Sequence, residues 1–526
     1  MPAIPKSILN FGADLATTWM PWRLRLSAVA AQAKTLRVLT RQLARTAQGR
    51  EYGITPTLAY GKFARLVKPV TYESLAPQLE RIYRGESDVL WPGPCTLFTR
   101  TAGTATPPKY LPVTPAMIQH YRVATLASLY FYTARIGHTG IFRGRQLFLG
   151  GNARLTSLPV AAADHAACGD LSAIAVQNLS PRFKKYFSEP SVAIAQIEDW
   201  SARLDAIVAR TQYRDITMLA GLPNWLTILI GRMLTRARKG NTRTANLQDL
   251  WPNFECLVHG GTSLASFTDE LKLLCGPGVR FHEVYPASEG FVAAQDAKHS
   301  LGLRLMTDVG IFYEFLPLPE YDSAPLAQLG PKAVPLESVK PGVDYVMLMT
   351  TPAGLCRYVN GDIVRFISTK PPRLIYVGQT KLRLNSFGER VLEKEITDAL
   401  LKVCLQHGWR LINFHVAPLI IISLTGHNRG RHEWWVELKP GTVITPTGPT
   451  LAIELDAELQ RISPGYAAKR QTGDMEDPIV RLVMPGIFAH WMQETGLWGD
   501  LHKMPRCRSD RTVADRLAEI ARFTAD

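Results

Sequence analysis

Short β-rich runs recur along the middle of this chain, separated by helical or Pro- and Gly-rich segments. Between residues 254 and 367 they read FECLVH, VRFHEVY, IFYEFLPL, DYVMLMTT and DIVRFI. Val, Ile, Phe and Tyr, which are typical of strands, are frequent in these runs. Strands that alternate with helices predict an α/β protein, in which sheets are layered with helices, and argue against an all-β sandwich.

Three stretches carry the signals of helices. Residues 25–50 place apolar side chains at helical spacing and end in basic residues, which suit the negative end of a helix dipole. Residues 114–136 begin with a Thr-Pro pair, a cap residue followed by proline in the first helical position. The apolar stretch 216–236, which contains a Gly-Leu-Pro step, predicts another buried helix.

The pattern restarts after the run LIYVG at 374–378. A helix is predicted at about 389–405, followed by the β-rich runs NFHVAPLIIISLT and HEWWVELK and by a helix at 451–462. A unit of this size can fold separately, and 526 residues are too many for one compact core. We therefore predict a large N-terminal domain, 1–378, and a smaller mobile α+β lid domain, 379–526.

Charge narrows the class of ligand. The chain has 60 Lys and Arg against 45 Asp and Glu, and the net charge of +15 suits anionic ligands such as nucleotides. Along the sequence the charges look scattered, without a basic stripe or interleaved aromatic residues, so we expect no nucleic-acid partner. No apolar run approaches about 20 residues, so neither a transmembrane helix nor stable membrane insertion is expected.

The seven cysteines are isolated and form no C-x-x-C pair. This spacing argues against a disulfide framework and a zinc site, and it fits a reducing compartment. The N-terminus lacks a long apolar core and a small-residue cleavage site, so it is a poor signal peptide. We expect a cytoplasmic protein that is a monomer or a weak homodimer.

The first motif that can carry chemistry is TRTAGTATPPKY at 99–110, directly after a β-like run. Backbone N–H groups and Thr hydroxyls in such a loop can donate to phosphate oxygens, while Lys109 neutralises charge. A loop of this composition is more often a simple turn. Its order differs from G-x-x-x-x-G-K-[ST], which excludes a Walker-type nucleotide site.

Three further motifs could contact a nucleotide. YPASEG offers Tyr285 as a flat face for a base and Glu289 as a carboxylate for Mg²⁺. RYVNGD ends in Asp362, which can accept hydrogen bonds from both hydroxyls of a ribose. In HGGT, consecutive glycines after a buried strand let a ligand pack against the backbone. Taken singly, each motif is explained as well or better by a strand end or a tight turn.

Taken in order, these motifs resemble those of the GH3-type acyl-acid amido synthetases, a branch of the acyl-adenylate-forming superfamily shared with luciferases and acyl-CoA ligases. The resemblance covers nearly the whole chain and identifies it as a bacterial-type member. It begins with FARLVKPVTYESLAPQLERIYRGESDVLWPG at 63–93 and runs through the four motifs. It extends into the predicted lid with FGERVLEKEI, RHEWWVELK, SPGYAAKR and GDLHKMPR.

The resemblance implies that these motifs together hold ATP and Mg²⁺. The phosphate loop and the lid supply the two lysines expected to be catalytic, Lys109 and Lys503, and Glu289 is the expected metal ligand. The other nucleotide contacts come from the phosphate loop, the glycine pair, the base-stacking motif and the ribose carboxylate. These are Thr101, Gly103, Thr104, Gly260, Gly261, Tyr285, Ser288 and Asp362.

The same resemblance implies the reaction. A carboxylic acid attacks the α-phosphate of Mg·ATP, which gives an acyl-adenylate and pyrophosphate, and an amine such as an amino acid then takes the acyl group as an amide. A thiol acceptor, either CoA or a carrier protein, stays open as an alternative. So does a non-catalytic nucleotide- or acyl-binding homologue, because this chain has Ala102, Ala105, Thr106 and Gln379 where the family usually has hydroxyls, a glycine and an arginine.

The helix at 114–136 is also expected to wall an apolar acyl pocket, although core packing explains its side chains equally well. The residues expected to line that pocket are Tyr121, Leu126, Tyr130 and Phe131. We interpret His259 and His282 as structural histidines rather than bases.

Overall fold

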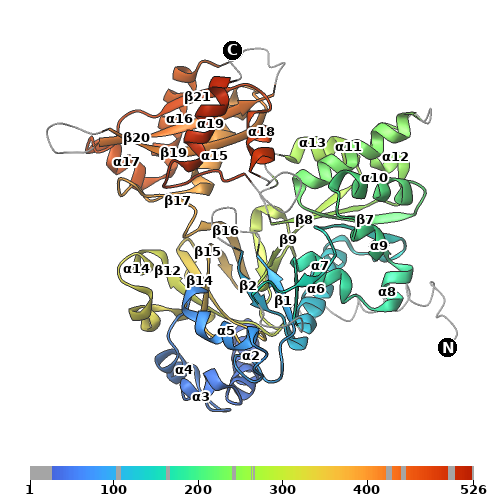
Figure 1. Cartoon of the computed structure of the whole chain (residues 1–526), viewed down its shortest axis with the longest axis vertical. Coiled ribbons are helices and arrows are strands. Elements are labelled where there is room, and N and C mark those ends of the chain that lie inside the picture. Colours follow the sequence, from blue (N-terminus) through green and yellow to red (C-terminus); the bar gives the residue numbers. More distant parts are fainter. Residues whose placement is uncertain are drawn as a thin grey trace. The chain divides into compact units, whose positions relative to one another are not determined.

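The computed structural model describes residues 27–101, 108–160, 166–239, 244–261, 264, 267–421, 429–439, 446–495 and 504–523. The chain forms two compact units, and Figure 1 labels many of their elements. The first unit contains Pro108–Asn360 and Val364–Ile375 together with the chain before the phosphate loop. The second contains Gly361–Ile363 and the chain from Tyr376 onward. The α/β class that the alternating runs predict is confirmed.

A 12-stranded sheet forms the centre of the first unit, in the order β13-β12-β14-β15-β16-β11-β10-β9-β8-β7-β3-β6. Strands β3, β7, β8 and β9 pair in parallel, whereas β9, β10, β11 and β16 pair antiparallel. The strands are β3 (Arg145–Leu149), β6 (Ser188–Glu189), β7 (Ile216–Gly221), β8 (Cys256–Gly260), β9 (Arg280–Ala287), β10 (Gly290–Ala294), β11 (Leu303–Leu305), β12 (Phe312–Pro317), β13 (Val334–Pro335), β14 (Asp344–Thr350), β15 (Tyr358–Thr369) and β16 (Pro372–Gln379).

A second, four-stranded sheet has the order β2-β1-β5-β4. Its strands are β1 (Leu97–Arg100), β2 (Tyr110–Pro112), β4 (Thr156–Ser157) and β5 (Ala167–Gly169). Helices of the first unit pack on these sheets or on one another; for example, α6 contacts β10, α11 contacts β7 and α13 contacts α11. They are α2 (Ala28–Leu43), α3 (Ala47–Glu51), α4 (Tyr60–Leu66), α5 (Ala76–Tyr83), α6 (Pro115–Ile136), α7 (Leu171–Gln177), α8 (Pro181–Tyr186), α9 (Val192–Ala195), α10 (Trp200–Thr211), α11 (Pro223–Lys239), α12 (Leu247–Leu250), α13 (Thr268–Cys275) and α14 (Leu318–Tyr321).

Helix α6 confirms the prediction made from its Thr-Pro start. The hydroxyl of Thr114 accepts a hydrogen bond of 3.1 Å from the backbone N–H of Met117, and Pro115 occupies the first turn. This cap satisfies one of the donors that a helix leaves open at its N-terminus. The helix then runs for 22 residues. In the part of the chain that the structure describes, no helix is both long and apolar enough to span a membrane.

Two helix predictions are wrong in part. Residues 216–221 form strand β7, and helix α11 begins only at Pro223. A strand that is buried on both faces of a parallel sheet reads as a continuous apolar run, so hydrophobicity alone does not distinguish it from a buried helix. The helix predicted over 25–50 is interrupted: α2 ends at Leu43, and the Thr46 side chain caps α3.

The second unit is built on a sheet of three strands in the order β19-β20-β21, with α15 and α16 on one face and α18 and α19 on the other. Adjacent residues Trp434 and Trp435 of β20 pack into these two different cores, as the alternation of a strand requires. The elements are β17 (Arg383–Leu384), β18 (Val391–Leu392), α15 (Glu393–Gln406), β19 (Leu411–Ile421), β20 (Arg429–Leu438), α16 (Gly448–Ile462), α17 (Pro464–Gln471), β21 (Ile479–Val483), α18 (Ile487–Glu494) and α19 (Thr512–Phe523).

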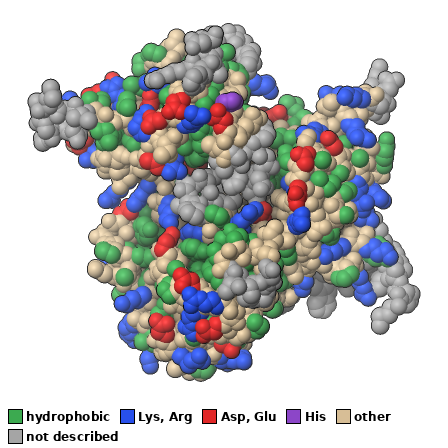
Figure 2. Space-filling view, viewed as in Figure 1, with side chains coloured by type: hydrophobic (Ala, Val, Ile, Leu, Met, Phe, Trp, Pro, Cys, Tyr) green, Lys and Arg blue, Asp and Glu red, His purple; other side chains and the backbone are tan. Residues whose placement is uncertain are grey.

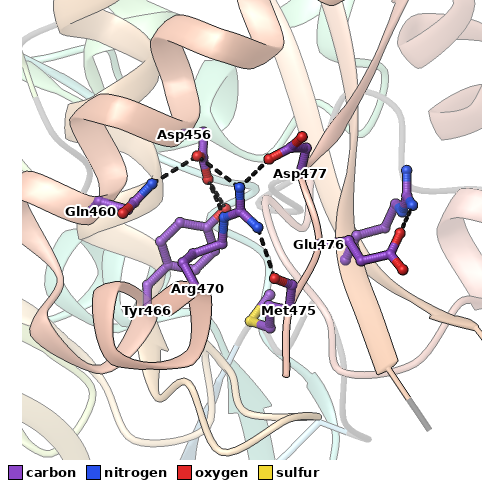
Figure 3. A network of polar contacts seen from close by, with 8 residues as sticks. Asp456, Gln460, Tyr466, Arg470, Met475, Glu476 and Asp477 are labelled. Atoms are coloured by element: carbon purple, nitrogen blue, oxygen red, sulfur yellow. Dashed lines mark hydrogen bonds and ion pairs between the residues drawn. The ribbon is translucent and has the colours of Figure 1, made fainter. Parts of the chain in front are cut away.

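The motif SPGYAAKR lies in α17. Its last residue, Arg470, forms hydrogen bonds with residues of neighbouring elements. The guanidinium of Arg470 donates to both carboxylate oxygens of Asp456, at 2.8 and 3.1 Å, and to the carbonyl oxygen of Met475 (Figure 3). Tyr466 and Gln460 donate to the same carboxylate, at 2.6 and 2.7 Å. The conformation of α17 against α16 therefore depends on this network, and the motif has a structural role.

Candidate functional site

The phosphate-loop motif connects β1 to β2. These strands pair antiparallel, with Arg100 opposite Tyr110, so the two ends of the loop meet. The N–H of Thr101 donates to the carbonyl oxygen of Lys109 at 2.9 Å, and the N–H of Lys109 donates to the Thr101 hydroxyl at 3.3 Å. The structure thus brings these two predicted site residues together. Gly103 and Thr104 lie outside the described residues.

The ammonium group of Lys109 is held at the base of this loop. Its Nζ lies 3.8 Å from a carboxylate oxygen of Glu73 and 5.2 Å from the ring centroid of Tyr72. The Glu73 side chain is 59% exposed, so the ion pair is solvated and weak. A phosphate that approaches the loop can therefore draw this cation away from Glu73 at small cost.

Ser288 and Glu289 form the turn between β9 and β10. The hydroxyl of Tyr121, on α6, donates to the carbonyl oxygen of Ser288 at 2.7 Å. Burial raises the pKa of Tyr121 well above its usual range, and the negative charge of Glu289 raises it further. The phenol therefore stays protonated and keeps donating to the turn, next to the carboxylate expected to bind a metal ion.

His120 supports the same turn from the preceding position of α6, a role that the sequence did not reveal. Its Nε2 accepts a hydrogen bond of 2.9 Å from the N–H of Phe291, and its Nδ1 lies 2.7 Å from the carbonyl oxygen of Val309. These partners require a neutral ring with the proton on Nδ1. Burial lowers the pKa of His120 to about 4, which keeps the ring in that form.

Gly290, the residue that follows this turn, has no space for a side chain. A Cβ atom at this position would overlap the Cδ1 atom of Ile311 and lie 3.3 Å from the Nε2 atom of His120. The backbone of the turn can approach this layer only without a side chain. Packing therefore requires the glycine that ends the YPASEG motif. Part of the motif thus reflects packing rather than ligand binding.

The glycine pair lies beside the strand that carries Tyr285. Gly260 is the last residue of β8 and pairs with Val284 of β9, where a Cβ atom would overlap the Val284 carbonyl oxygen. Gly261 follows directly. Tyr285 is the next residue of β9 and is half-buried, with part of its ring packed on the core cluster that contains Ala293. Two of the predicted nucleotide-contact motifs are thus neighbours on adjacent strands.

Asp362 belongs to the second unit and lies inside β15 rather than at its start. The alternative interpretation of Gly361-Asp362 as a hairpin turn is therefore wrong. The Asp362 carboxylate is buried and accepts a hydrogen bond of 2.9 Å from the side-chain amide of Gln379. Gln379 thus contacts the carboxylate expected to bind ribose. Lys503 lies outside the described residues.

The acyl-pocket prediction for α6 is wrong for Leu126, whose side chain is 61% exposed. Tyr130 and Phe131 are buried in a core cluster with Phe291, which supports the alternative of core packing. The hydroxyl of Tyr121 supports the β9–β10 turn, as described above.

Both other histidines behave as structural residues. The Nε2 of His282 lies 2.9 Å from the Ser128 hydroxyl, and burial lowers the pKa of His282 to about 3. His259 is 3% exposed, and burial lowers its pKa to about 4. Both rings are shielded from solvent and stay neutral at ordinary pH. This fits the interpretation that they are structural histidines rather than catalytic bases.

Family models match most of the chain. The model of the GH3 family N-terminal domain matches residues 24–279, that of the central domain matches 304–379, and that of the C-terminal domain matches 392–512.

Individual relatives are distant. The probable indole-3-acetic acid-amido synthetase GH3.1 of Arabidopsis thaliana is 24% identical over 304 residues, which are 55% of this chain and 49% of that protein. The match thus spans about half the length of this relative. A protein of the same name from Oryza sativa subsp. japonica is 23% identical over 561 residues, covering 91% of this chain and 88% of the relative.

Among solved structures, the AtGH3.15 acyl acid amido synthetase in complex with 2,4-DB matches with a TM-score of 0.76. The match covers 99% of this chain and 97% of that chain at 16% identity. At this identity the likeness shows a shared fold.

Proposed function

This chain belongs to the GH3 family, and we propose that it is an ATP-dependent acyl-acid amido synthetase. The observation that carries the proposal is the grouping on β8, β9 and β10. There the glycine pair, Tyr285 and the turn with Glu289 stand on three neighbouring strands, and α6 supports the turn from behind. A nucleotide site needs these features together: open backbone, a flat ring and a carboxylate near the phosphates.

Glu289 fits a magnesium ion that arrives with ATP. Mg²⁺ binds through one or two carboxylates plus substrate phosphates and water, so one carboxylate on a well-supported turn is sufficient. Within the described residues no cluster of three or more His, Cys, Asp or Glu could hold a metal by itself. When bound, Mg²⁺ would neutralise charge on the phosphates.

The proposed chemistry has two steps. A carboxylate oxygen of the acid forms a bond to the α-phosphorus of ATP, and the bond to pyrophosphate breaks. The nitrogen of an amine then bonds to the acyl carbon, the bond to AMP breaks, and the nitrogen gives up a proton. Thr101 and Lys109 would hold the phosphates, Asp362 the ribose, and Lys503 would reach the reacting phosphate. Positioning and charge stabilisation carry such a reaction without a protein nucleophile.

In this proposal residues 379–526 act as a lid that turns between the steps and excludes water from the adenylate. Lys503, within this lid, would be placed differently before and after the turn. We further propose that the enzyme works in the cytoplasm as a monomer or a weak homodimer.

Carboxylate-dependent exchange between ATP and pyrophosphate across a panel of acids tests the first step. We expect exchange with at least one acid. Measurable ATP binding without exchange for any acid would instead support a non-catalytic homologue. Mass spectrometry of reactions supplied with amino acids or CoA then identifies the acceptor, and a thioester in place of an amide would overturn the amido synthetase proposal.

Two substitutions test the residues. We expect Lys109→Ala and Glu289→Gln each to lower the exchange rate about a hundredfold, since each removes a charge that acts on the phosphates. Lys272→Ala and Glu270→Gln, on the exposed part of α13, are matched controls expected to leave it unchanged. Exchange at the wild-type rate in the first pair would refute the site assignment.

A further inference from the structure

Residues 27–72 carry much of the positive charge of the chain. They contain eight Lys and Arg and a single acidic residue, Glu51, so their net charge is +7 out of +15 for the whole chain. All eight cationic side chains are exposed. This α2–α4 basic surface consists of Lys34, Arg37, Arg41, Arg45, Arg50, Lys62, Arg65 and Lys68.

Three of these eight cations form a stripe on helix α2. Its buried residues include Leu36, Leu39 and Leu43, which pack into the core of the first unit. The exposed cations Lys34, Arg37 and Arg41 recur every three or four residues, so they line the opposite side of the helix, and Arg45 follows two residues after its end. The sequence-based expectation of scattered charge without a basic stripe is therefore wrong here, because the stripe becomes visible only once the helix boundaries are known.

These cations have no carboxylate partners within the described chain. The contacts that Arg37, Arg45 and Arg50 make are with neutral oxygens at 3.1 to 3.4 Å. Elsewhere on the surface, many arginines are paired; Arg232, for example, lies 2.9 Å from Asp205. Eight cations with a single acidic residue among them repel one another, so the surface gains from an external polyanion. Figure 2 shows Lys and Arg side chains around the lower end of the view, where α2–α4 lie in Figure 1, with Asp and Glu side chains among them.

Aliphatic side chains within this surface indicate the kind of polyanion. Val29, Val38 and Leu66 are exposed by 39%, 49% and 40%. In contrast, the aromatic residues Tyr52 and Tyr60 of the same segment are half-buried, so no exposed ring is available for base stacking. Cations interspersed with exposed aliphatic groups suit the headgroups and the outer acyl region of a lipid bilayer.

We propose that the α2–α4 basic surface docks this protein reversibly on a membrane that contains anionic lipids. Docking is peripheral: the cations contact headgroups, and the aliphatic side chains reach the interface. The proposal does not depend on the ligase activity, because none of these residues belongs to the candidate site.

Co-sedimentation with vesicles tests it. The vesicles are phosphatidylcholine alone or phosphatidylcholine with about a third phosphatidylserine, in about 0.1 M salt. We expect the wild-type chain to bind only the anionic vesicles and to be released by about 1 M salt. A quadruple variant with Lys34→Gln, Arg37→Gln, Arg41→Gln and Arg45→Gln should bind about a thousandfold more weakly.

A matched control removes four exposed cations elsewhere in the first unit, with Arg182→Gln, Lys185→Gln, Arg236→Gln and Lys239→Gln. It should retain vesicle binding within about twofold, although its net charge equals that of the first variant. Thermal unfolding monitored by circular dichroism verifies that both variants are folded.

Three results would overturn the proposal. The wild-type chain could fail to bind the anionic vesicles, or the control could lose as much binding as the variant at positions 34, 37, 41 and 45, which would indicate a general charge effect. Alternatively, a single-stranded oligonucleotide could bind through the same cations while vesicles do not, which would assign the surface to nucleic acid. Exchange between ATP and pyrophosphate should be equal in all three proteins, so the outcome is separate from that of the proposed function.

Discussion

The side-chain amide of Gln379 donates a hydrogen bond of 2.9 Å to the carboxylate of Asp362. Gln379 ends β16, and Asp362 lies on the adjacent strand β15. A neutral amide orients the carboxylate without adding charge, whereas an arginine at the same place would add a cation. Gln379 therefore orients the carboxylate that we propose binds ribose, but it supplies no positive charge.

Gln379→Ala should weaken ATP binding about fivefold, because it removes one hydrogen bond that orients Asp362. Gln379→Glu should weaken it further, since it sets a second carboxylate beside the first. Isothermal titration calorimetry with ATP measures both effects. Equal affinity in the wild type and the alanine variant would mean that Asp362 is oriented without Gln379.

Gly290→Ala should destabilise the first unit by about 1–3 kcal/mol, because the new methyl group overlaps Ile311 Cδ1. The variant Ile311→Val removes that atom and should cost about 1 kcal/mol alone. The double variant should be more stable than the sum of the two single effects predicts. Thermal unfolding of the four proteins measures this coupling, and strict additivity would contradict the contact.

Gly260→Ala provides the contrasting case. Its methyl group would overlap the backbone carbonyl oxygen of Val284, which no side-chain substitution can move. Trimming the neighbouring side chain with Val284→Ala should therefore restore little stability. A rescue as large as that expected for Gly290 would show that the strands β8 and β9 can separate at this point.

The local pattern of residue types predicted the strands that are rich in β-branched and aromatic residues. The Thr-Pro cap predicted α6. It could not predict partners far apart in sequence. His120 binds the N–H of Phe291, and Gln379 binds Asp362, but neither residue carries a pattern that points to the other. The turn at Glu289 was found through its motif, whereas the side chains that support it required the three-dimensional structure.

Acid should destabilise the protein through His120. Its pKa is about 4 when folded and about 6.5 when unfolded. Between these values the unfolded chain binds a proton that the folded chain does not, so stability falls as the pH drops from about 6.5 towards 4. The contribution of this one ring is about 2 kcal/mol at pH 5. His120→Gln should therefore show a smaller loss of stability between pH 7 and pH 5 in thermal or urea unfolding.

A substitution without a titrating group supplies the control for that measurement. Thr125→Ser, at an exposed position of the same helix α6, should leave the pH dependence of stability unchanged. If both variants followed the wild-type curve, the buried ring of His120 would not contribute to the acid sensitivity.

Arg357 and Glu314 form a fully buried ion pair in the first unit. The guanidinium donates to both carboxylate oxygens at 2.8 and 2.9 Å and also to the carbonyl oxygens of Ala64, Val67 and Gly330. Arg357→Met should destabilise the unit by about 3–5 kcal/mol, since it leaves a buried carboxylate unpaired. The double variant Arg357→Met/Glu314→Leu should recover part of this loss, but not all of it, because three carbonyl groups still lack their donor.

The pH dependence of the Arg357→Met variant separates lost charge pairing from lost packing. Burial raises the pKa of Glu314, and Arg357 opposes that rise in the wild type. Without the arginine the folded state takes up a proton at Glu314 more readily than the unfolded state. The stability deficit of the variant should therefore shrink as the pH falls from 8 to about 5, because the buried carboxyl group is protonated in the folded state before it is protonated in the unfolded state. Urea unfolding at several pH values measures the deficit; a deficit that stays constant would assign the loss to packing and to the three carbonyl groups alone.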